Sequence, residues 1–380
     1  MLLRNAQDPA TPALWPPRRS RPVVILLLCS ASAILALAIT RAERPRELLD
    51  PANLVYKGTA HTATNTRPYM WRSSEELFIT EHEDSGDDKT FVYNLKNHSS
   101  RLLTDMAPKS VAEAIAEVND PGSAMCVSPD GKWMAWRSFE GIAFWRIYTS
   151  ELHQYRCKDS LDLMWAANSN ACFGLHHSKN KSGEWHVDEV TLFAPTEAHA
   201  ISSTAVPSDS RLNDLVTLCM DCDIGNYRDQ VADRDNHICQ VTWVGSYYDT
   251  SASVAFATRI SVNDIGLASP EHKVSMPEGW VPFLFKISPS GKRIAWLLLS
   301  SQQTFLQRTL NRFFPNKARS DTEVSLWVSN FDGSNMKELG LTHDDAGMHC
   351  TNSNPAWLPD ESAVSYIHNG DLFRIKVPDD

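Results

Sequence analysis

Short alternating runs of apolar and polar residues, separated by turn residues, recur along most of the chain. The clearest two copies, 126–136 (CVSPDGKWMAW) and 286–296 (KISPSGKRIAW), align without a gap. In each copy an apolar strand end precedes Ser-Pro-x-Gly, with Pro second and Gly fourth, as a type I turn prefers. An alternating strand then follows, so the pattern predicts a β-hairpin in both places.

Weaker copies of this hairpin extend the pattern. Residues 356–366 (AWLPDESAVSY) keep Pro359 and Asp360 but carry Glu361 in place of glycine, and 71–80 and 165–174 keep only the entering Trp and the exiting strand. A second strand pair follows, clearest at 326–333 (LWVSNFDG), where Asp-Gly supplies the turn. Four short strands per repeat predict radially stacked sheets, and the repeated tryptophans are expected to pack between them.

The combination of S-P-D-G-K-x-x-A-W at 128–136 with L-W-V-S-N-x-D-G-S at 326–334 resembles the TolB-like (WD-repeat-like) propeller repeat over most of 50–377. The resemblance implies an all-β fold, a six-bladed β-propeller. Blades are expected to begin near Tyr69, Ala124, Leu163, Val241, Phe283 and Pro355, with the boundaries of the fourth left open.

The two ends of the repeat region are expected to pair. The last repeat stops at 372–377 with too little chain left for an outer strand, whereas 53–57 (NLVYK) is a strand without a partner of its own. Pairing them closes the ring and removes an exposed sheet edge.

An uncharged apolar run from Pro22 ends just before Arg41 and is long enough to cross a hydrocarbon core of roughly 30 Å. We predict a disordered basic tail (1–21), a transmembrane signal anchor (22–41), a linker (42–50) and the propeller (51–380). The alternatives are a cleaved signal at Ala36-Leu37-Ala38 and lipid attachment at Cys29.

Arginines on both sides of this run set its orientation. Four precede it and three follow, which favours a cytoplasmic N-terminus by one residue. The propeller is therefore expected at the plasma (inner) membrane, on its periplasmic or extracytoplasmic side.

Charge and motifs limit the function classes. A net charge of -10 without a concentrated basic surface argues against a general nucleic-acid binder. The sequence contains no G-x-S-x-G elbow, Walker loop, Rossmann fingerprint or H-E-x-x-H helix. The TolB-like resemblance implies protein–protein interaction within a cell-envelope assembly, so we expect a non-enzymatic, membrane-anchored scaffold that binds a protein partner there.

One candidate metal site combines Cys219, Cys222, His237 and Cys239, because thiolates and imidazole suit tetrahedral zinc. The single residue between His237 and Cys239 is tight for chelation. In an oxidising compartment a disulfide between two of the cysteines is the simpler interpretation, and unpaired thiols in an irregular loop are the third.

A second candidate site is the sixth-repeat loop 341–355, which holds His343, Asp344, Asp345 and His349 and is expected on the channel face. Some TolB-like propellers are polysaccharide lyases that hold a divalent cation with histidines in such a loop. The resemblance thus implies an alternative function, a metal-dependent polysaccharide lyase or hydrolase. A polar, solvated channel mouth is the other interpretation. We predict no cofactor, with a divalent metal as the alternative.

An insert at 300–321 contains Leu306, Leu310 and Phe313 at helical spacing. We predict a basic amphipathic helix and place a candidate partner contact at its Arg308, Arg312, Phe313 and Phe314. The alternative is a short helix packed on the flank of the propeller with its charges in water.

Overall fold

In a computed structural model the chain consists of two compact units, Met1–Pro45 and Arg46–Asp380. All described residues lie in the second unit. They are 47–58, 69–82, 88–109, 111, 125–138, 141–156, 160–179, 181, 183, 185–197, 200–207, 225–233, 235, 237–245, 254–261, 272–300, 322–344, 355–368 and 370–378.

Six four-stranded antiparallel sheets make up this unit. The first three are β2 (Tyr69–Trp71), β3 (Glu76–His82), β4 (Asp88–Asn94), β5 (Ser99–Leu102); β6 (Met125–Val127), β7 (Trp133–Ser138), β8 (Gly141–Arg146), β9 (Leu152–Arg156); and β10 (Ser160–Trp165), β11 (Cys172–Lys179), β12 (Trp185–Phe193), β13 (Ala200–Ala205).

The other three follow in the same pattern. They are β14 (Gly225–Ala232), β15 (His237–Gly245), β16 (Val254–Ser261), β17 (His272–Val274); β18 (Trp280–Ile287), β19 (Arg293–Ser300), β20 (Thr322–Asn330), β21 (Lys337–Asp344); and β22 (Ala356–Trp357), β23 (Ala363–His368), β24 (Asp371–Lys376), β1 (Leu54–Tyr56). A short helix, α2 (Leu103–Met106), follows β5.

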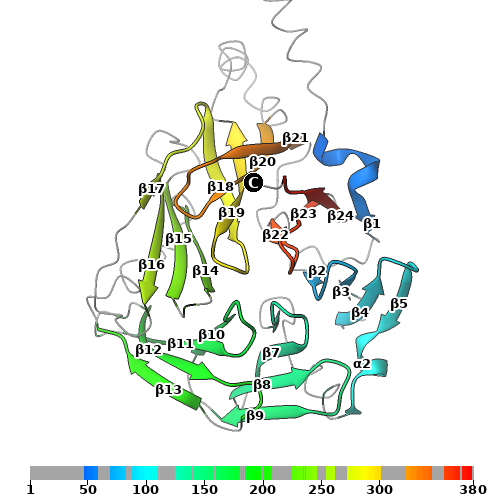
Figure 1. Cartoon of the computed structure of the whole chain (residues 1–380), viewed down its shortest axis with the longest axis vertical. Helices are drawn as coiled ribbons and strands as arrows, with labels where there is room; N and C mark the ends of the chain where they lie inside the picture. The colour runs from blue at the N-terminus through cyan, green and yellow to red at the C-terminus, as the bar shows by residue number, and fades with distance from the viewer. Residues whose placement is uncertain are drawn as a thin grey trace, which may run out of the picture. The chain divides into compact units, whose positions relative to one another are not determined.

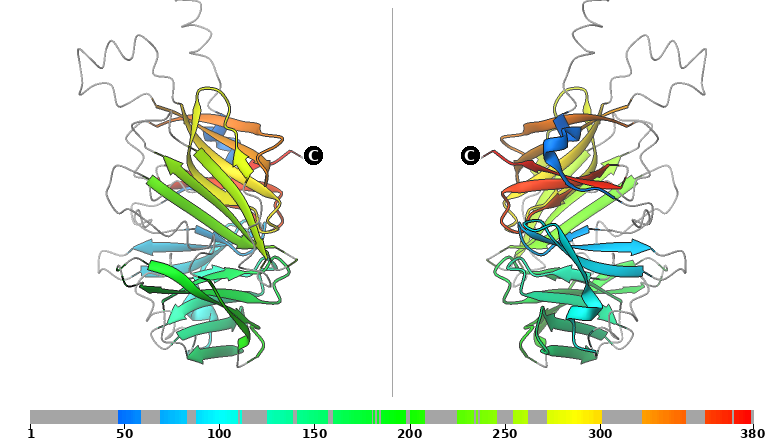
Figure 2. Two further views of the ribbon diagram at one scale, coloured as in Figure 1. Left: turned by 90° about the vertical axis from the view of Figure 1, so that its left-hand side faces the viewer. Right: turned by 90° about the vertical axis from the view of Figure 1, so that its right-hand side faces the viewer.

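The sheets follow one another around a ring, with the first strand of each sheet innermost (Figure 1). These inner strands contact their counterparts in neighbouring sheets, as β10 contacts β6 and β14 contacts β18. Figure 2 shows the strands running across the thickness of the ring. The predicted all-β, six-bladed propeller is confirmed.

Blade four begins earlier than the sequence predicted. Val241, the expected start, lies in β15, the second strand of this blade, and pairs with Asp229 of the inner strand β14. The sequence of β14 (GNYRDQVA) is mostly polar and lacks the Ser-Pro turn that marks other inner strands. The segment interpreted as an irregular loop thus supplies an innermost strand.

The predicted ring closure is confirmed. Strand β1 pairs antiparallel with β24, with Leu54 opposite Phe373, and becomes the fourth strand of blade six. Two 3₁₀ turns precede it, η1 (Glu47–Leu49) and η2 (Pro51–Asn53). Leu48, inside the segment 42–50 predicted as a linker, is wholly buried in the core shared by blades five and six.

The hairpin turns have the predicted type I bond. The Gly131 N–H donates to the Ser128 carbonyl at 2.8 Å, and Gly291 repeats this bond to Ser288 at 2.9 Å. Both glycines have a positive φ, 69° and 72°. We call the face of the ring that carries these turns, including 128–132 and 288–292, the turn face.

Hydrogen bonds join neighbouring blades on the turn face, and each of the six junctions has at least one. The pairs are Arg72 Nε to Gly131 O, Asp130 N to Ser169 Oγ, Ala167 N to Ala232 O, Arg259 Nη2 to Gly291 O, Arg293 Nη2 to Glu361 O and Arg374 Nη1 to Ser74 O. Their lengths of 2.9 to 3.2 Å are ordinary for N–H donors.

Three of the repeated tryptophans reinforce these junctions. Each ends an inner strand and donates its indole N–H to the preceding blade: Trp71 to Ser365 Oγ, Trp165 to Cys126 O and Trp357 to Lys286 O. All three are buried. The expected packing of tryptophans between blades is confirmed for them, with a hydrogen bond at each ring.

Among the described residues, no helix is long and apolar enough to cross a membrane. The predicted anchor over 22–41 and the basic tail lie outside those residues, so the tether stays a prediction.

Removing 1–57 should abolish cooperative unfolding of the propeller, because it strips β1 from β24 and Leu48 from the core. Removing 1–45 should leave the melting temperature unchanged. Thermal melts of both proteins, followed by circular dichroism, make the comparison; equal melting temperatures would disprove the closure.

Gly131→Ala should destabilise the protein more than Gly183→Ala. Both glycines have positive φ, so both changes carry a backbone strain of about 1–2 kcal/mol. A Cβ at Gly131 would lie 2.3 Å from the Arg72 carbonyl oxygen, whereas at Gly183 it meets nothing within 4 Å. Urea denaturation compares the two; similar losses would show that the blade junction tolerates the side chain.

Candidate functional site

A pocket of about 550 Å³ lies between blades four and five on the turn face. It is formed where the start of β15, the end of β16 and the start of β17 meet two turns of blade five. Its lining residues are His237, Arg259, Ser261, His272, Lys292, Asn330, Phe331 and Asp332.

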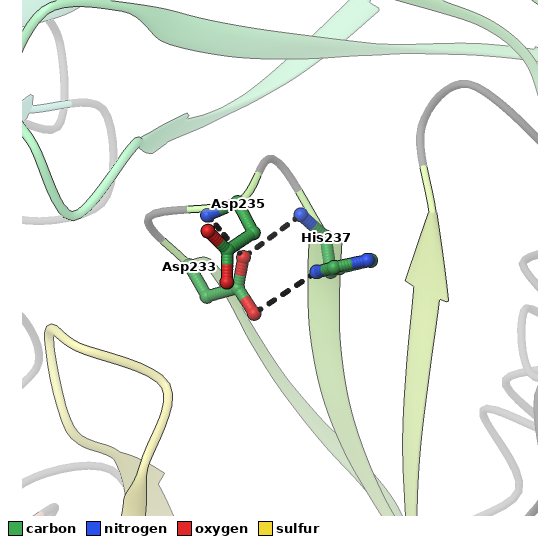
Figure 3. A group of neighbouring side chains, drawn as sticks. All are labelled: Asp233, Asp235 and His237. Carbon is green, nitrogen blue, oxygen red and sulfur yellow. Dashed lines mark hydrogen bonds and ion pairs between the residues drawn. The ribbon is translucent and has the colours of Figure 1, made fainter.

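Asp233 organises the turn between β14 and β15 (Figure 3), and this turn contributes His237 to the pocket lining. The backbone N–H of Asp233 donates to the His237 carbonyl at 2.9 Å, as Ser128 does to Trp133 in blade two. Asp233 Oδ1 accepts the backbone N–H groups of Asp235 and His237, both at 2.9 Å. Asp233 therefore caps this hairpin as serine does in the Ser-Pro turns.

The second carboxylate oxygen of Asp233 contacts two neighbouring basic side chains. Oδ2 lies 3.3 Å from His237 Nδ1 and 3.5 Å from Arg259 Nε. The Asp233 side chain is only 9% exposed, and a buried carboxylate requires such partners. Asp233 is the only carboxylate among the buried residues of the described chain, so this compensation fixes where Arg259 lies.

Arg259 is held on three sides. Besides Asp233, its Nη2 donates to the Gly291 carbonyl at 3.2 Å, and its guanidinium lies 5.2 Å from the centre of the Phe331 ring. Glycine is required at 291, because a Cβ there would lie 2.9 Å from Cys239 Sγ. The Arg259 side chain is nevertheless 45% exposed and lines the pocket. It is a positioned cation with surface left for a ligand.

Two cations, Arg259 and Lys292, line the pocket beside one lining carboxylate, Asp332, and His237 and His272 add charge when protonated. Asp233, which is outside the lining, lies 3.5 Å from Arg259 Nε and offsets part of its charge. Hydrogen bonds from Ser334, and then the nearby His272, lower the pKa of Asp332. Guanidinium and ammonium groups bind carboxylates and phosphates through charge-assisted hydrogen bonds, so the lining is suited to an anionic group.

Asp233, Asp235 and His237 also form a geometric cluster, with ligand atoms within 4.8 Å of one another. The chemistry disfavours a metal there. Oδ1 of Asp233 already caps two backbone N–H groups, and the guanidinium beside Oδ2 repels a cation. The cluster is a capped turn with internal charge compensation.

Cys239, from the predicted zinc or disulfide set, lies behind this turn as a buried free thiol. Burial, opposed by Arg259 and reinforced by Asp233, raises the pKa of Cys239 to about 11, so the thiol is neutral at pH 7. His237 lies at the start of the same strand and contacts Asp233. Cys219 and Cys222 lie outside the described residues, so the zinc and disulfide predictions stay predictions.

The other predicted sites are placed in part. His343 and Asp344 end β21, the outermost strand of blade five, and pair with Glu323 and Thr322 of β20. This end of β21 is opposite the end that borders the pocket. Asp345 and His349 lie outside the described residues, as do Arg308, Arg312, Phe313 and Phe314.

Sequence reasoning missed the pocket. Lys292 and Asp332 lie in turns that the repeat pattern identified, but it gave them only a turn role. His272 and Arg259 lie in blade four, whose repeat is the least regular. A search for charged residues beside each turn glycine is the one signal that would have marked Lys292 and Asp332.

No family model and no curated protein matches the sequence. Solved structures with a similar fold include a putative TolB from Agrobacterium tumefaciens, 13% identical, covering 83% of this chain and 90% of that one, with a TM-score of 0.41. TolB from Acinetobacter baumannii is 11% identical, covering 82% and 80%, with a TM-score of 0.34. A PL25 polysaccharide lyase, an ulvan lyase, is 8% identical, covering 83% and 82%, with a TM-score of 0.34. These are similarities of fold, and the strand pairing itself establishes the blade number.

Asp233→Ala should destabilise the protein by about 1–3 kcal/mol, because it leaves two backbone N–H groups without their acceptor and Arg259 without its carboxylate. Asp235→Ala removes an exposed carboxylate of the same turn and should cost less than about 0.5 kcal/mol. Urea denaturation of both variants measures the difference, and equal losses would refute the capping role.

Proposed function

We propose that this chain is a non-enzymatic, membrane-anchored propeller that acts as a protein-binding scaffold in the cell envelope. The pocket between blades four and five docks an acidic segment of its protein partner. The observation that carries this proposal is Arg259, a half-exposed guanidinium held by a buried carboxylate and the Gly291 carbonyl, with Lys292 beside it in the lining.

Preorganisation supports a binding role for these cations. A flexible surface arginine loses conformational freedom when it binds a ligand, which weakens the complex. Arg259 is already fixed by an ion pair, a hydrogen bond and a ring contact. An incoming carboxylate therefore meets a guanidinium that needs little further ordering.

The chemistry of the pocket favours an acidic peptide as the occupant. Phe331 is buried to 8% exposure beneath Arg259 and offers an apolar surface next to the charges, which suits a side chain with both a methylene stem and a carboxylate. A net charge of -10 repels a long polyanion such as nucleic acid more strongly than a short acidic segment. Aspartate, glutamate and a C-terminal carboxylate are the groups that fit.

The hydrogen bonds between blades support the scaffold role. Hydrogen bonds at all six junctions hold the blades together, so residues from blades four and five keep their spacing without a ligand. Functional groups on such a framework act through position, not through large movements.

The tether and the extracytoplasmic side rest on the apolar run at 22–40 and the arginines around it. No observation among the described residues favours the alternative, a metal-dependent lyase using His343, Asp344, Asp345 and His349.

The intact chain in detergent should bind a fluorescent hexaglutamate peptide but not hexalysine, measured by anisotropy at low salt. Lys292→Glu should weaken binding about tenfold, or about 1.4 kcal/mol. Lys273→Glu is the matched control, because Lys273 is an exposed residue of β17 outside the pocket lining. Equal losses in both variants would show that net charge alone attracts the peptide and would overturn the proposed site.

A further inference from the structure

Two cysteines meet at the junction between blades two and three. Cys126 lies in β6, the inner strand of blade two, and Cys172 begins β11, the second strand of blade three. Cys172 pairs directly with Trp165, whose indole N–H donates to the Cys126 carbonyl at 3.2 Å. The two thiols are free. Cys172 belongs to the buried cluster at this junction, and Cys126 packs against that cluster.

We propose that Cys126 and Cys172 are an interblade dithiol that oxidises to a disulfide by exchange with a protein or small-molecule disulfide. The first thiolate attacks the oxidant, forms a mixed disulfide and releases one thiolate of the oxidant. The second thiolate then attacks the Cys126 sulfur and displaces the remaining half. The two cysteines lose two electrons and two protons, and the oxidant leaves as two thiols.

The surroundings assign the order of these steps. Cys126 is half-buried and therefore within reach of an external disulfide, whereas Cys172 is fully buried. Burial, and then the neighbouring Cys126, raise the pKa of Cys172 well above its ordinary value. Cys126 is thus the attacking thiol and Cys172 the resolving thiol.

The Trp165 hydrogen bond favours this cross-link because it already holds β10 of blade three against β6 of blade two. Phe144 and Phe193 pack in the same buried cluster as Cys172 and Trp165, with Cys126 against it. This packing brings the two cysteines to the same interblade contact, where a disulfide would join β6 to β11. It links two blades whose intervening chain contains the rest of blade two, which restricts the unfolded chain and stabilises the ring.

The cross-link is independent of the acidic-peptide pocket. The redox state of this cysteine pair reports localisation, because disulfides persist in oxidising compartments and thiols persist in the cytosol.

The test uses the intact chain, purified in detergent under reducing conditions and then incubated with oxidised glutathione. After alkylation of free thiols and proteolysis, mass spectrometry should find a peptide pair joined through Cys126 and Cys172, and the melting temperature should rise. Cys172→Ser and Cys126→Ser should each remove both effects. Cys239→Ser is the matched control, since Cys239 is an equally buried free thiol in blade four.

Persistence of the melting-temperature rise in Cys172→Ser, or a cross-link joining Cys126 to any other cysteine, would overturn the proposal. So would two free thiols at 126 and 172 in the wild-type chain after exchange. Should Cys172→Ser fail to fold, Cys126→Ala supplies the same readout from the more exposed position. The experiment on the isolated chain tests whether the disulfide can form. Alkylation of thiols in intact cells is a separate experiment, which tests localisation.

Discussion

The structure depends on hydrogen bonds that pass from blade to blade around the turn face. Each blade is a small sheet that cannot bury both of its faces alone, so its stability comes from its neighbours. At three of the six junctions the repeated turn supplies the acceptor: the carbonyl of Gly131, Gly291 or Glu361 accepts a hydrogen bond from an arginine of a neighbouring blade. Aromatic rings also contact these arginines. The guanidinium group of Arg72, for example, lies over the Tyr148 ring.

The candidate pocket results from one irregular junction. Where blades two and five have Ser128 and Ser288 at the start of the turn, blade four has Asp233, whose extra oxygen binds Arg259 and His237. The same side chain thus satisfies a structural requirement and introduces charge beside a cavity. Departure from the repeat therefore coincides with the site that we assign to a partner.

The repeat pattern predicted the fold because turns and alternating strands are local features. Ser-Pro-x-Gly specifies its hairpin through φ angles and one backbone bond, and both appear in the structure at Gly131 and Gly291. The start of blade four was not predicted, because β14 is polar and its turn uses aspartate. The pocket was not predicted for a different reason: Arg259 and Lys292 are distant in sequence, and only the folded ring brings blades four and five together. No short stretch of sequence shows which residues of two neighbouring blades will meet.

Closure by β1 has a consequence for biosynthesis. This strand is made before the other described strands, whereas its partner β24 (Asp371–Lys376) is made after them. Blade six therefore cannot be completed until β24 has left the ribosome, and the backbone groups of β1 lack their native partner until then. The five other blades can form during that interval, so the ring stays open at this junction until β24 is available.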